Sequence, residues 1–353
     1  MQSLGTLEDL PQQYRDDLTQ MNLVPLWPNL RAVLPPRIPS RQTRPTVWNY
    51  QALRPQLMKA GELTPMEKAE RRVLVLANPG HGLENMKASP AIYLGMQLLL
   101  PGEWAPSHRH TPNAVRMVVE GTGAFTTVDG EKCPMERGDL ILTPTGLWHE
   151  HEHAGKDPVV WLDVLDLPLI YYSETSYATE GARQEVGEGR GDQAHTAGGV
   201  VPAPLFERDS QKAYPMLRYP WSAVRQALIT MADDRPALEA VQVGYINPKN
   251  GQDVQNNLGF YALMLRPGQK VTLPARSPSA VYHVIEGGCE ISGEDLPTMN
   301  LSEADTCVVP GYTASQIRNC SLTAPAFVFI ADEAPLHRKL GVYEVRNAPA
   351  QAS

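Results

Sequence analysis

The 353-residue sequence predicts a mainly β protein made of two small antiparallel barrels, with helices near its N-terminal end and between the barrels. Its 32 prolines and 27 glycines are typical of a turn-rich β protein rather than a helical bundle. Short runs of strand-forming residues follow similar patterns in both halves of the chain, which indicates an internal duplication. A chain of this length is expected to form two domains.

Residues 1–70 predict a helical arm. Asp9-Leu10-Pro11 is a helix start with proline at the first helical position, and apolar residues recur at helical spacing as far as Met21. Prolines between residues 25 and 39 end this helix and predict an extended segment, which in a two-barrel protein is suited to wrapping around another subunit. A second helix is expected at residues 50–62.

Residues 71–175 predict the first barrel. A strand at residues 70–76 and a turn at Asn78-Pro79-Gly80 come first. Short strands separated by turns then follow, at residues 91–100, 107–110, 114–120, 124–128, 139–143, 149–153 and 159–165. On the leading strand Arg72 shares a face with Leu74 and Leu76, and it either lies solvated at the barrel rim or reaches a substrate carboxylate.

Residues 176–240 predict a linker and a helix. Glycines among polar residues mark a long loop between residues 171 and 215. A helix capped by Ser222 is expected at Trp221–Ala232. The second barrel and a C-terminal tail are expected at residues 241–353, where Val281–Gly287 repeats the pattern of Val115–Gly121.

Five of the nine histidines lie on two of the predicted strands. Side chains two apart on a strand point to the same side, so His108 and His110 present both imidazoles to one point. His149, from a distant strand, supplies the third imidazole, and His151 on the same face is the alternative. Histidine is the commonest protein ligand for divalent first-row metals, so the pattern predicts a metal centre inside the barrel.

The spacing around these histidines resembles the paired motifs of the cupin superfamily, small barrels with a metal in the lumen. The two blocks are His108-x-His110-x3-Ala114-x6-Gly121 and Gly138-Asp139-x4-Pro144-x-Gly146-x2-His149. Cupins usually have glutamate where this chain has Ala114, so the predicted site consists of three neutral ligands. The charge of the metal is then uncompensated and about half of an octahedral shell is open, which favours an anionic chelating substrate.

The duplication places non-ligand residues at the corresponding positions of the second barrel. The same offsets lead to Pro274, Arg276 and Ser315, so this barrel is expected to be metal-free. His283, the one histidine on its equivalent strands, is expected to be structural. The whole chain is therefore predicted to be a bicupin with one working site.

Three further residues are candidates for chemistry in the first barrel. Counting by twos from Ala114 places Arg116 inside the barrel, where its guanidinium either binds a substrate carboxylate or forms an internal salt bridge to Asp163. His151 either donates to a substrate oxygen or takes its proton, with Asp163 orienting the imidazole. His153 is expected at the barrel mouth, with no assigned role.

Charge and composition exclude several classes of partner. The formal net charge of −8, with no basic run, argues against nucleic acid and leaves a small molecule. No apolar window reaches the length of a membrane helix and no secretory signal is evident, so a cytoplasmic location is expected. The four cysteines show no C-x-x-C pairing and are expected to be reduced thiols.

The motifs together resemble the gentisate 1,2-dioxygenase family, which includes salicylate and 1-hydroxy-2-naphthoate dioxygenases. The resemblance rests on residues 101–110, Ala114-Val115-Arg116, Thr143-Pro144 and Trp148-His149-Glu150-His151, and it extends upstream to residues 70–74. Family members often have aspartate where this chain has Glu150, whose side chain is expected to point away from the lumen.

The resemblance implies one Fe(II) per chain and a homotetramer. Its implied metal ligands are His108, His110 and His149. Its implied substrate-positioning or acid–base residues are Arg116, His151 and Asp163, with Arg72 and Gly95 along the substrate pocket.

The implied reaction opens gentisate with O2 between the carboxyl- and hydroxyl-bearing carbons, giving maleylpyruvate. Two alternatives remain open. One is cleavage of salicylate or 1-hydroxy-2-naphthoate, with selectivity set by pocket residues such as Tyr93 and Met96. The other is a bicupin that binds an aromatic acid without turnover. A metal-dependent isomerase or decarboxylase is less compatible with the missing glutamate.

Overall fold

The computed structural model describes residues 5–187, 191–195 and 213–346, and the chain divides into two compact units, Met1–Gln42 and Thr43–Ser353. The first unit contains α1 (Gln12–Gln20) and α2 (Leu30–Val33), and neither helix has a buried residue. α1 begins later than predicted because Pro11 is its N-cap. Tyr14 and Met21, two of the apolar residues that recur at helical spacing, are both exposed.

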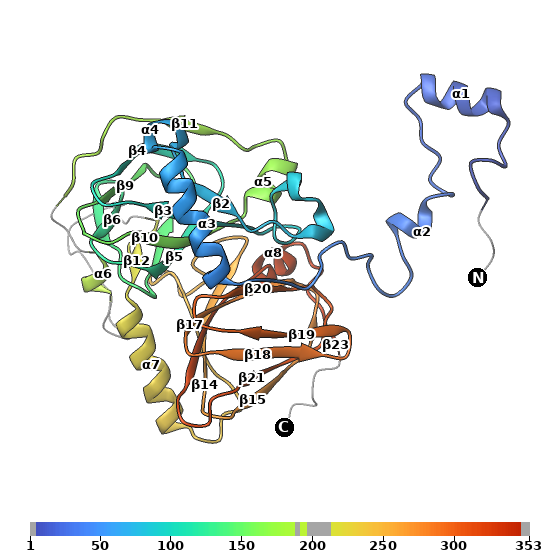
Figure 1. Cartoon of the computed structure of the whole chain (residues 1–353). Coiled ribbons are helices and arrows are strands. Elements are labelled where there is room, and N and C mark those ends of the chain that lie inside the picture. Colours follow the sequence, from blue (N-terminus) through green and yellow to red (C-terminus); the bar gives the residue numbers. More distant parts are fainter. Residues whose placement is uncertain (1–4, 188–190, 196–212, 347–353) are drawn as a thin grey trace. The chain divides into compact units, whose positions relative to one another are not determined.

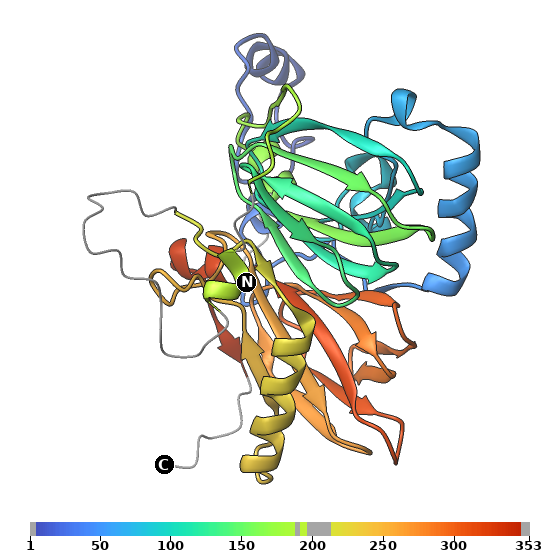
Figure 2. The same cartoon turned by 90° about the vertical axis from the view of Figure 1, so that its left-hand side faces the viewer.

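The second unit contains two barrels, each built from two antiparallel sheets (Figures 1 and 2). The strands of barrel 1 are β2 (Val73–Val75), β3 (Tyr93–Leu99), β4 (Trp104–His110), β5 (Ala114–Glu120), β6 (Ala124–Val128), β7 (Glu131–Pro134), β8 (Leu140–Thr143), β9 (His149–His153), β10 (Val159–Leu165), β11 (Ala178–Glu180) and β12 (Arg218–Tyr219). Its sheets have the orders β12-β8-β5-β10-β3-β2 and β11-β4-β9-β6-β7.

Barrel 2 repeats this arrangement. Its strands are β1 (Thr46–Trp48), β13 (Val241–Gly244), β14 (Gly259–Leu265), β15 (Lys270–Leu273), β17 (Ala280–Glu286), β18 (Cys289–Gly293), β19 (Leu296–Leu301), β20 (Thr306–Val309), β21 (Ser315–Asn319) and β22 (Ala326–Asp332). Its sheets have the orders β1-β20-β17-β22-β14-β13 and β15-β21-β18-β19. A separate pair, β16 (Ala275–Arg276) and β23 (Val345–Arg346), joins the last described residues to this barrel. The predicted mainly β fold of two barrels is confirmed.

The two barrels keep a constant offset in sequence. β5 begins at Ala114 and β17 at Ala280, 166 residues later, and the same 166 residues separate the start of β9 at His149 from the start of β21 at Ser315. Pro274, Arg276 and Ser315 line one small hollow of barrel 2, at the positions that match the three histidines. The guanidinium of Arg276 pairs there with Asp332 at 3.0 Å.

Helices connect and flank the barrels. They are α3 (Tyr50–Leu63), α4 (Met66–Ala69), α5 (Leu167–Tyr172), α6 (Gly191–Ala194), α7 (Trp221–Asp234) and α8 (Ala334–Lys339), with 3-10 turns η1 (Pro79–His81) and η2 (Leu83–Asn85). The prediction that Ser222 caps α7 is wrong, because the helix begins at Trp221 with Pro220 as its N-cap. Among the described residues, no helix is long and apolar enough to cross a membrane.

The two repeats exchange their leading strands. β1, directly before α3, pairs with β20 of barrel 2, whereas β12, directly before α7, pairs with β8 of barrel 1. α3 nevertheless packs on β3 of barrel 1, and α7 packs on β13 and β14 of barrel 2. Each helix therefore starts beside one barrel and lies on the other.

The boundary between the two compact units, after Gln42, differs from the boundary at residue 70 that was expected from the sequence. Residues 43–70, which the sequence-based division assigns to the arm, lie in the compact unit with both barrels. Parts of the predicted linker (188–190 and 196–212) and of the predicted tail (347–353) lie outside the described residues.

Candidate metal centre and active site

Three histidines from two neighbouring strands of barrel 1 meet in its interior. His108 and His110 come from β4 and His149 from β9, and each offers a ligand atom within 4.8 Å of the others. The ring centroids of His108 and His149 are 4.1 Å apart, and those of His110 and His149 are 4.7 Å apart. The structure thus brings together the three side chains that the sequence proposed as ligands.

A bulge in β4 sets the register of these rings. Ala105 pairs with His151, but His108 pairs with His149, so β4 carries one extra residue between the two pairs. Bulges of this kind re-aim side chains near active sites. The shift places His108 directly opposite His149, while the period of the strand keeps His110 on the same side.

Backbone carbonyls orient two of the rings. His110 Nδ1 lies 2.7 Å from the carbonyl oxygen of Pro112, and His149 Nδ1 lies 3.0 Å from that of Leu147. A carbonyl only accepts hydrogen bonds, so Nδ1 carries the proton in each ring and Nε2 keeps its lone pair. His149 Nε2 is buried without a hydrogen-bond partner among the described residues. An orphaned imidazole nitrogen beside two others fits a divalent metal.

Burial keeps these imidazoles neutral. It lowers the pKa of His108 to about 2 and that of His110 to about 4, and the positive charges of Arg71 and Arg116 act in the same direction. The pKa of His149 is also lowered far below its usual value, first by burial and then by Arg116. Since metal ligation requires neutral imidazole, protons do not compete for the site near neutral pH.

The same burial makes the stability of the metal-free protein depend on pH. Burial lowers the pKa of His151 strongly and that of His283 to about 3. Together with the three histidines of the metal centre, these residues bind protons less well in the folded than in the unfolded chain. Stability is expected to fall as the pH drops through 6.5, by up to about 1.4 kcal/mol per histidine per pH unit. Burial raises the pKa of Asp139 and of Asp163 to about 6, so below about pH 6 both bind protons more readily in the folded than in the unfolded chain. Their protonation therefore offsets part of the loss of stability at low pH.

Thermal unfolding of chelator-treated protein between about pH 8 and about pH 6 measures this dependence. His283 is one of these histidines and lies in barrel 2, away from the metal centre. The Tm of His283→Gln is therefore expected to depend less steeply on pH than that of wild type. A Tm that stays constant over this range would contradict the neutral state of the buried histidines.

Arg116 and Asp163 form a buried ion pair on the adjoining sheet. They are opposite each other on β5 and β10, and Arg116 Nε lies 3.4 Å from Asp163 Oδ1. Arg116 also donates to Thr143 Oγ1, and Trp161 Nε1 donates to Asp163 Oδ1 at 3.1 Å. The internal salt bridge to Asp163, which the sequence analysis left as one of two alternatives, is therefore present. Arg116 Nε makes this ion pair without meeting hydrogen-bond geometry to any group in the described part of the chain.

His151 lies beside this pair rather than in the group of three. Its Nδ1 is 2.9 Å from Thr126 Oγ1, and its ring packs 5.0 Å from that of Trp161. Its Nε2 is buried and has no partner among the described residues. A neutral imidazole with one free nitrogen in the lumen is able to exchange a proton with a bound ligand.

Arg72 does not reach the metal centre. It is 3% exposed, its guanidinium forms two hydrogen bonds of 2.7 and 2.8 Å with Glu103, and its Nε donates to the carbonyl of Thr64. The structure therefore supports neither a solvated rim position nor contact with a substrate.

Arg71, rather than its neighbour Arg72, lies beside the metal centre. Its guanidinium contacts His108 Nδ1 and donates to the carbonyl of Pro106 at 2.6 Å. Burial, followed by repulsion from Arg116, lowers its pKa to about 10. Arg71 shares its face with Val73 and Val75, whereas Arg72 shares its face with Leu74 and Leu76.

Gly95 lies on the lumen side of β3, opposite Asp163. A Cβ atom at this position would be 2.5 Å from Val73 Cγ1 and 2.9 Å from Tyr93 Oη. The absence of a side chain therefore leaves room where Tyr93, Val73 and Asp163 converge. Any larger residue at Gly95 narrows this part of the lumen.

The remaining histidines of interest have structural partners. His153 Nε2 lies 2.6 Å from the carbonyl of Asp157, and its Nδ1 accepts from Gly155 N at 3.1 Å, so the ring fixes a turn. His283 Nδ1 bonds Thr306 Oγ1 at 2.9 Å inside barrel 2. Neither geometry indicates a ligand site.

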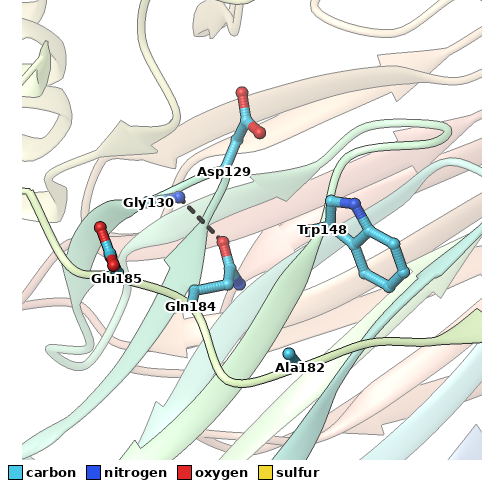
Figure 3. Close-up of a pocket in the computed structure, with 6 residues that line it drawn as sticks. All are labelled: Asp129, Gly130, Trp148, Ala182, Gln184 and Glu185. Carbon is cyan, nitrogen blue, oxygen red and sulfur yellow. Dashed lines mark hydrogen bonds between the residues drawn. The ribbon is translucent and has the colours of Figure 1, made fainter.

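A hollow of about 480 Å³ lies between the Asp129-Gly130 turn and the segment after β11. Figure 3 shows it, with Trp148 on one side and the hydrogen bond from Gly130 N to Gln184 Oε1 across it. Neighbouring residues of an extended chain face opposite ways, so Trp148 faces this hollow while His149 faces the lumen. The hollow is therefore separate from the metal centre.

The fold and the site together define a bicupin with a three-histidine metal centre in its first barrel. A family model described as a cupin domain matches residues 95–165. The chain is 69% identical to a gentisate 1,2-dioxygenase from Ralstonia sp. over 98% of this chain and 96% of that protein. It is 32% identical to a 1-hydroxy-2-naphthoate 1,2-dioxygenase from Nocardioides sp. (strain KP7), over 88% of this chain and 80% of that protein.

Among solved structures, the salicylate 1,2-dioxygenase of Pseudoaminobacter salicylatoxidans with gentisate matches with a TM-score of 0.87 and 30% identity, over 99% of this chain and 96% of that one. The chain belongs to the gentisate 1,2-dioxygenase family of cupin ring-cleaving dioxygenases. The family predicted from the sequence motifs is confirmed.

Proposed function

We propose that this chain opens the ring of gentisate with O2, between the carboxyl-bearing carbon and the adjacent hydroxyl-bearing carbon, to give maleylpyruvate. Both oxygen atoms enter the product, so no external reductant is needed. The observation that carries the proposal is the pairing of a three-histidine site with buried arginines, in a chain 69% identical to a gentisate 1,2-dioxygenase. The proposed cofactor is one Fe(II) per chain, which supplies the redox chemistry that lets O2 react with the ring.

The charges around the site favour a chelating anion. The three proposed ligands, His108, His110 and His149, are neutral, and the described residues place the guanidinium groups of Arg71 and Arg116 and the carboxylate of Asp163 in the lumen. We therefore expect Arg116 and Arg71 to bind the substrate carboxylate, because a guanidinium offers the planar fork that such a group matches. This binding orients the adjacent ring hydroxyl toward the histidines.

We propose that His151 exchanges a proton with the substrate and that Asp163 orients Arg116. With its Nδ1 at Thr126, His151 has Nε2 available to take the 2-hydroxyl proton or to donate to the oxygen at ring position 5. Asp163 holds Arg116 through their ion pair and is itself held by Trp161. Gly95 leaves space on this side of the pocket.

A second candidate is cleavage of salicylate, favoured by the match to a salicylate 1,2-dioxygenase with gentisate over 99% of this chain. An oxygen-electrode measurement on anaerobically Fe(II)-loaded protein separates the candidates. We expect one O2 consumed per gentisate and a ring-opened keto acid, with slower uptake on salicylate and 1-hydroxy-2-naphthoate. Binding of gentisate without oxygen uptake would identify a non-catalytic binder, and faster uptake on salicylate would reverse the assignment.

Arg71 and Arg72 are adjacent, so replacing each by methionine tests which one serves the substrate. Arg71→Met is expected to raise the KM for gentisate by about tenfold or more, because a charge-assisted bond of about 1.5–3 kcal/mol is lost. Arg72→Met is expected to lower Tm, since it leaves Glu103 without its partner, and to raise KM by less than Arg71→Met does. Steady-state kinetics beside thermal unfolding measure both effects. The reverse pattern would return the substrate role to Arg72.

A homotetramer is also proposed. In its support, the first unit exposes large apolar side chains, namely Leu7, Tyr14, Met21, Leu23, Val24, Leu26, Trp27, Val33, Leu34 and Ile38. Apolar surface on this scale is characteristic of an interaction site. Light scattering of the whole chain tests the subunit number.

We propose a cytoplasmic location for the protein, which its sparse cysteines support.

A further inference from the structure

The two repeats begin with the same helix start. Tyr50-Gln51-Ala52-Leu53-Arg54 opens α3 and Trp221-Ser222-Ala223-Val224-Arg225 opens α7, and both helices are 14 residues long. In each, an aromatic residue is first in the helix and an arginine follows one turn later. The pattern shows that the duplicated unit includes the helix as well as the barrel.

One carboxylate from the underlying barrel holds the side chains of each helix start. Glu120, at the end of β5, accepts from Tyr50 Oη at 2.8 Å and from Arg54 Nε at 2.8 Å. Glu286, at the end of β17, accepts from Trp221 Nε1 at 2.7 Å and from Arg225 Nε at 3.0 Å. The two arrangements are equivalent.

A second carboxylate, from the opposite barrel, holds the first backbone N–H of each helix. Tyr50 N donates to Asp305 Oδ1 at 2.7 Å, and Trp221 N donates to Asp139 Oδ1 at 2.8 Å. Asp305 directly precedes β20 of barrel 2, and Asp139 directly precedes β8 of barrel 1. A carboxylate in this position satisfies an unpaired N–H and complements the helix dipole. Barrel 2 therefore anchors α3, although α3 lies on barrel 1.

The far ends of the two helices differ in what they reach. After α3 ends, the carbonyl of Thr64 accepts from Arg72 Nε at 3.0 Å. Arg72 is the chain neighbour of Arg71, whose guanidinium contacts His108. α7 instead leads to β13, an edge strand of barrel 2. Only α3 therefore connects an anchored start to the metal centre.

We propose that Asp305 and Glu120 are positioning residues for substrate binding. Together they fix the first turn of α3, and through α3 and Arg72 they hold Arg71 beside His108. The second barrel thus contributes to the reaction of the first through Asp305, without binding substrate or metal. This inference rests on the role proposed above for Arg71.

Glu120→Gln and Glu286→Gln form a matched pair for the test. Each removes the charge of a glutamate that binds the aromatic residue and the arginine of one helix start. The two glutamate side chains are similarly exposed, at 25% and 30%. Glu120→Gln and Asp305→Asn are expected to raise the KM for gentisate by about three- to tenfold, with metal content and kcat near wild type. Glu286→Gln is expected to keep the wild-type KM, because α7 does not lead to the site.

Hydrogen exchange supplies a readout that does not depend on turnover. Amides of residues 64–75 are expected to exchange faster in Glu120→Gln and Asp305→Asn than in wild type, and at the wild-type rate in Glu286→Gln. If Asp305→Asn does not fold, Glu120→Gln and Tyr50→Phe carry the same test. Failure of wild type to consume oxygen with gentisate would contradict the proposed function. The exchange rates would still show whether Glu120 and Asp305 hold residues 64–75 in place.

Two results would overturn the inference. One is a wild-type KM together with wild-type exchange rates in Glu120→Gln. The other is an equal rise in KM in Glu286→Gln, because the effect would then reflect general loosening of the two barrels rather than the path through α3.

Discussion

Replacement of His149 by alanine is expected to abolish both metal retention and ring cleavage. The side chain is fully buried, and its Nε2 has no hydrogen-bond partner among the described residues. Its ring centroid lies 4.1 Å from that of His108 and 4.7 Å from that of His110. Loss of a direct ligand should weaken metal binding by more than about 100-fold, the upper range for loss of an outer partner of a ligand. Metal content per chain after anaerobic loading and desalting measures the effect, with oxygen uptake measured on the same samples.

Two buried histidines serve as controls for this replacement. His283→Ala removes an equally buried imidazole from barrel 2, so it should lower Tm but leave one metal per chain. His151→Ala tests the alternative third ligand and is expected to retain metal while losing activity. Full metal content in His149→Ala, or metal loss in His151→Ala, would show that the third ligand has been misassigned.

Much of the site could be predicted because it depends on local periodicity. The spacing of His108 and His110 places both rings on one face of any regular strand, and the turns around His149 fix where the partner strand begins. The constant offset between the barrels placed Arg276 and Ser315 at ligand positions by counting alone. Arg116 followed from the same count along its own strand.

The features missed from the sequence depend on partners distant in the chain. Alternation grouped Arg72 with Leu74 and Leu76, but both faces of β2 are apolar, so the pattern did not show which face meets the lumen. Pairing of β2 with β3 decides that Arg71 is the inward residue.

The residue that caps α7 was predicted wrongly for a related reason, although the predicted start at Trp221 is correct. Its first N–H is bound by Asp139, far upstream in the sequence, so no local capping residue marks where the helix begins. Similarly, β1 has only three residues, and its pairing with barrel 2 leaves no periodic signal in the sequence.

Arg116→Met is expected to retain metal and lose gentisate binding. The guanidinium is fully buried between Asp163 and Thr143, and no other cation pairs with Asp163 in the described structure. Removing one partner of a buried charge pair costs about 2–5 kcal/mol, so kcat/KM should fall by about 30-fold or more. The pKa of Asp163, already raised by burial, should rise further because Arg116 is the main group that lowers it.

The neutral carboxamide of gentisate shows whether this loss reflects the substrate carboxylate. If Arg116 binds that carboxylate, wild type prefers the acid over the amide, and Arg116→Met loses part of the preference because the acid then keeps Arg71 as its remaining charged partner. Anaerobic titration of both ligands into the metal-loaded proteins measures the difference. An undiminished preference in Arg116→Met would mean that the carboxylate is held elsewhere, with Arg71 as the remaining guanidinium at the metal centre.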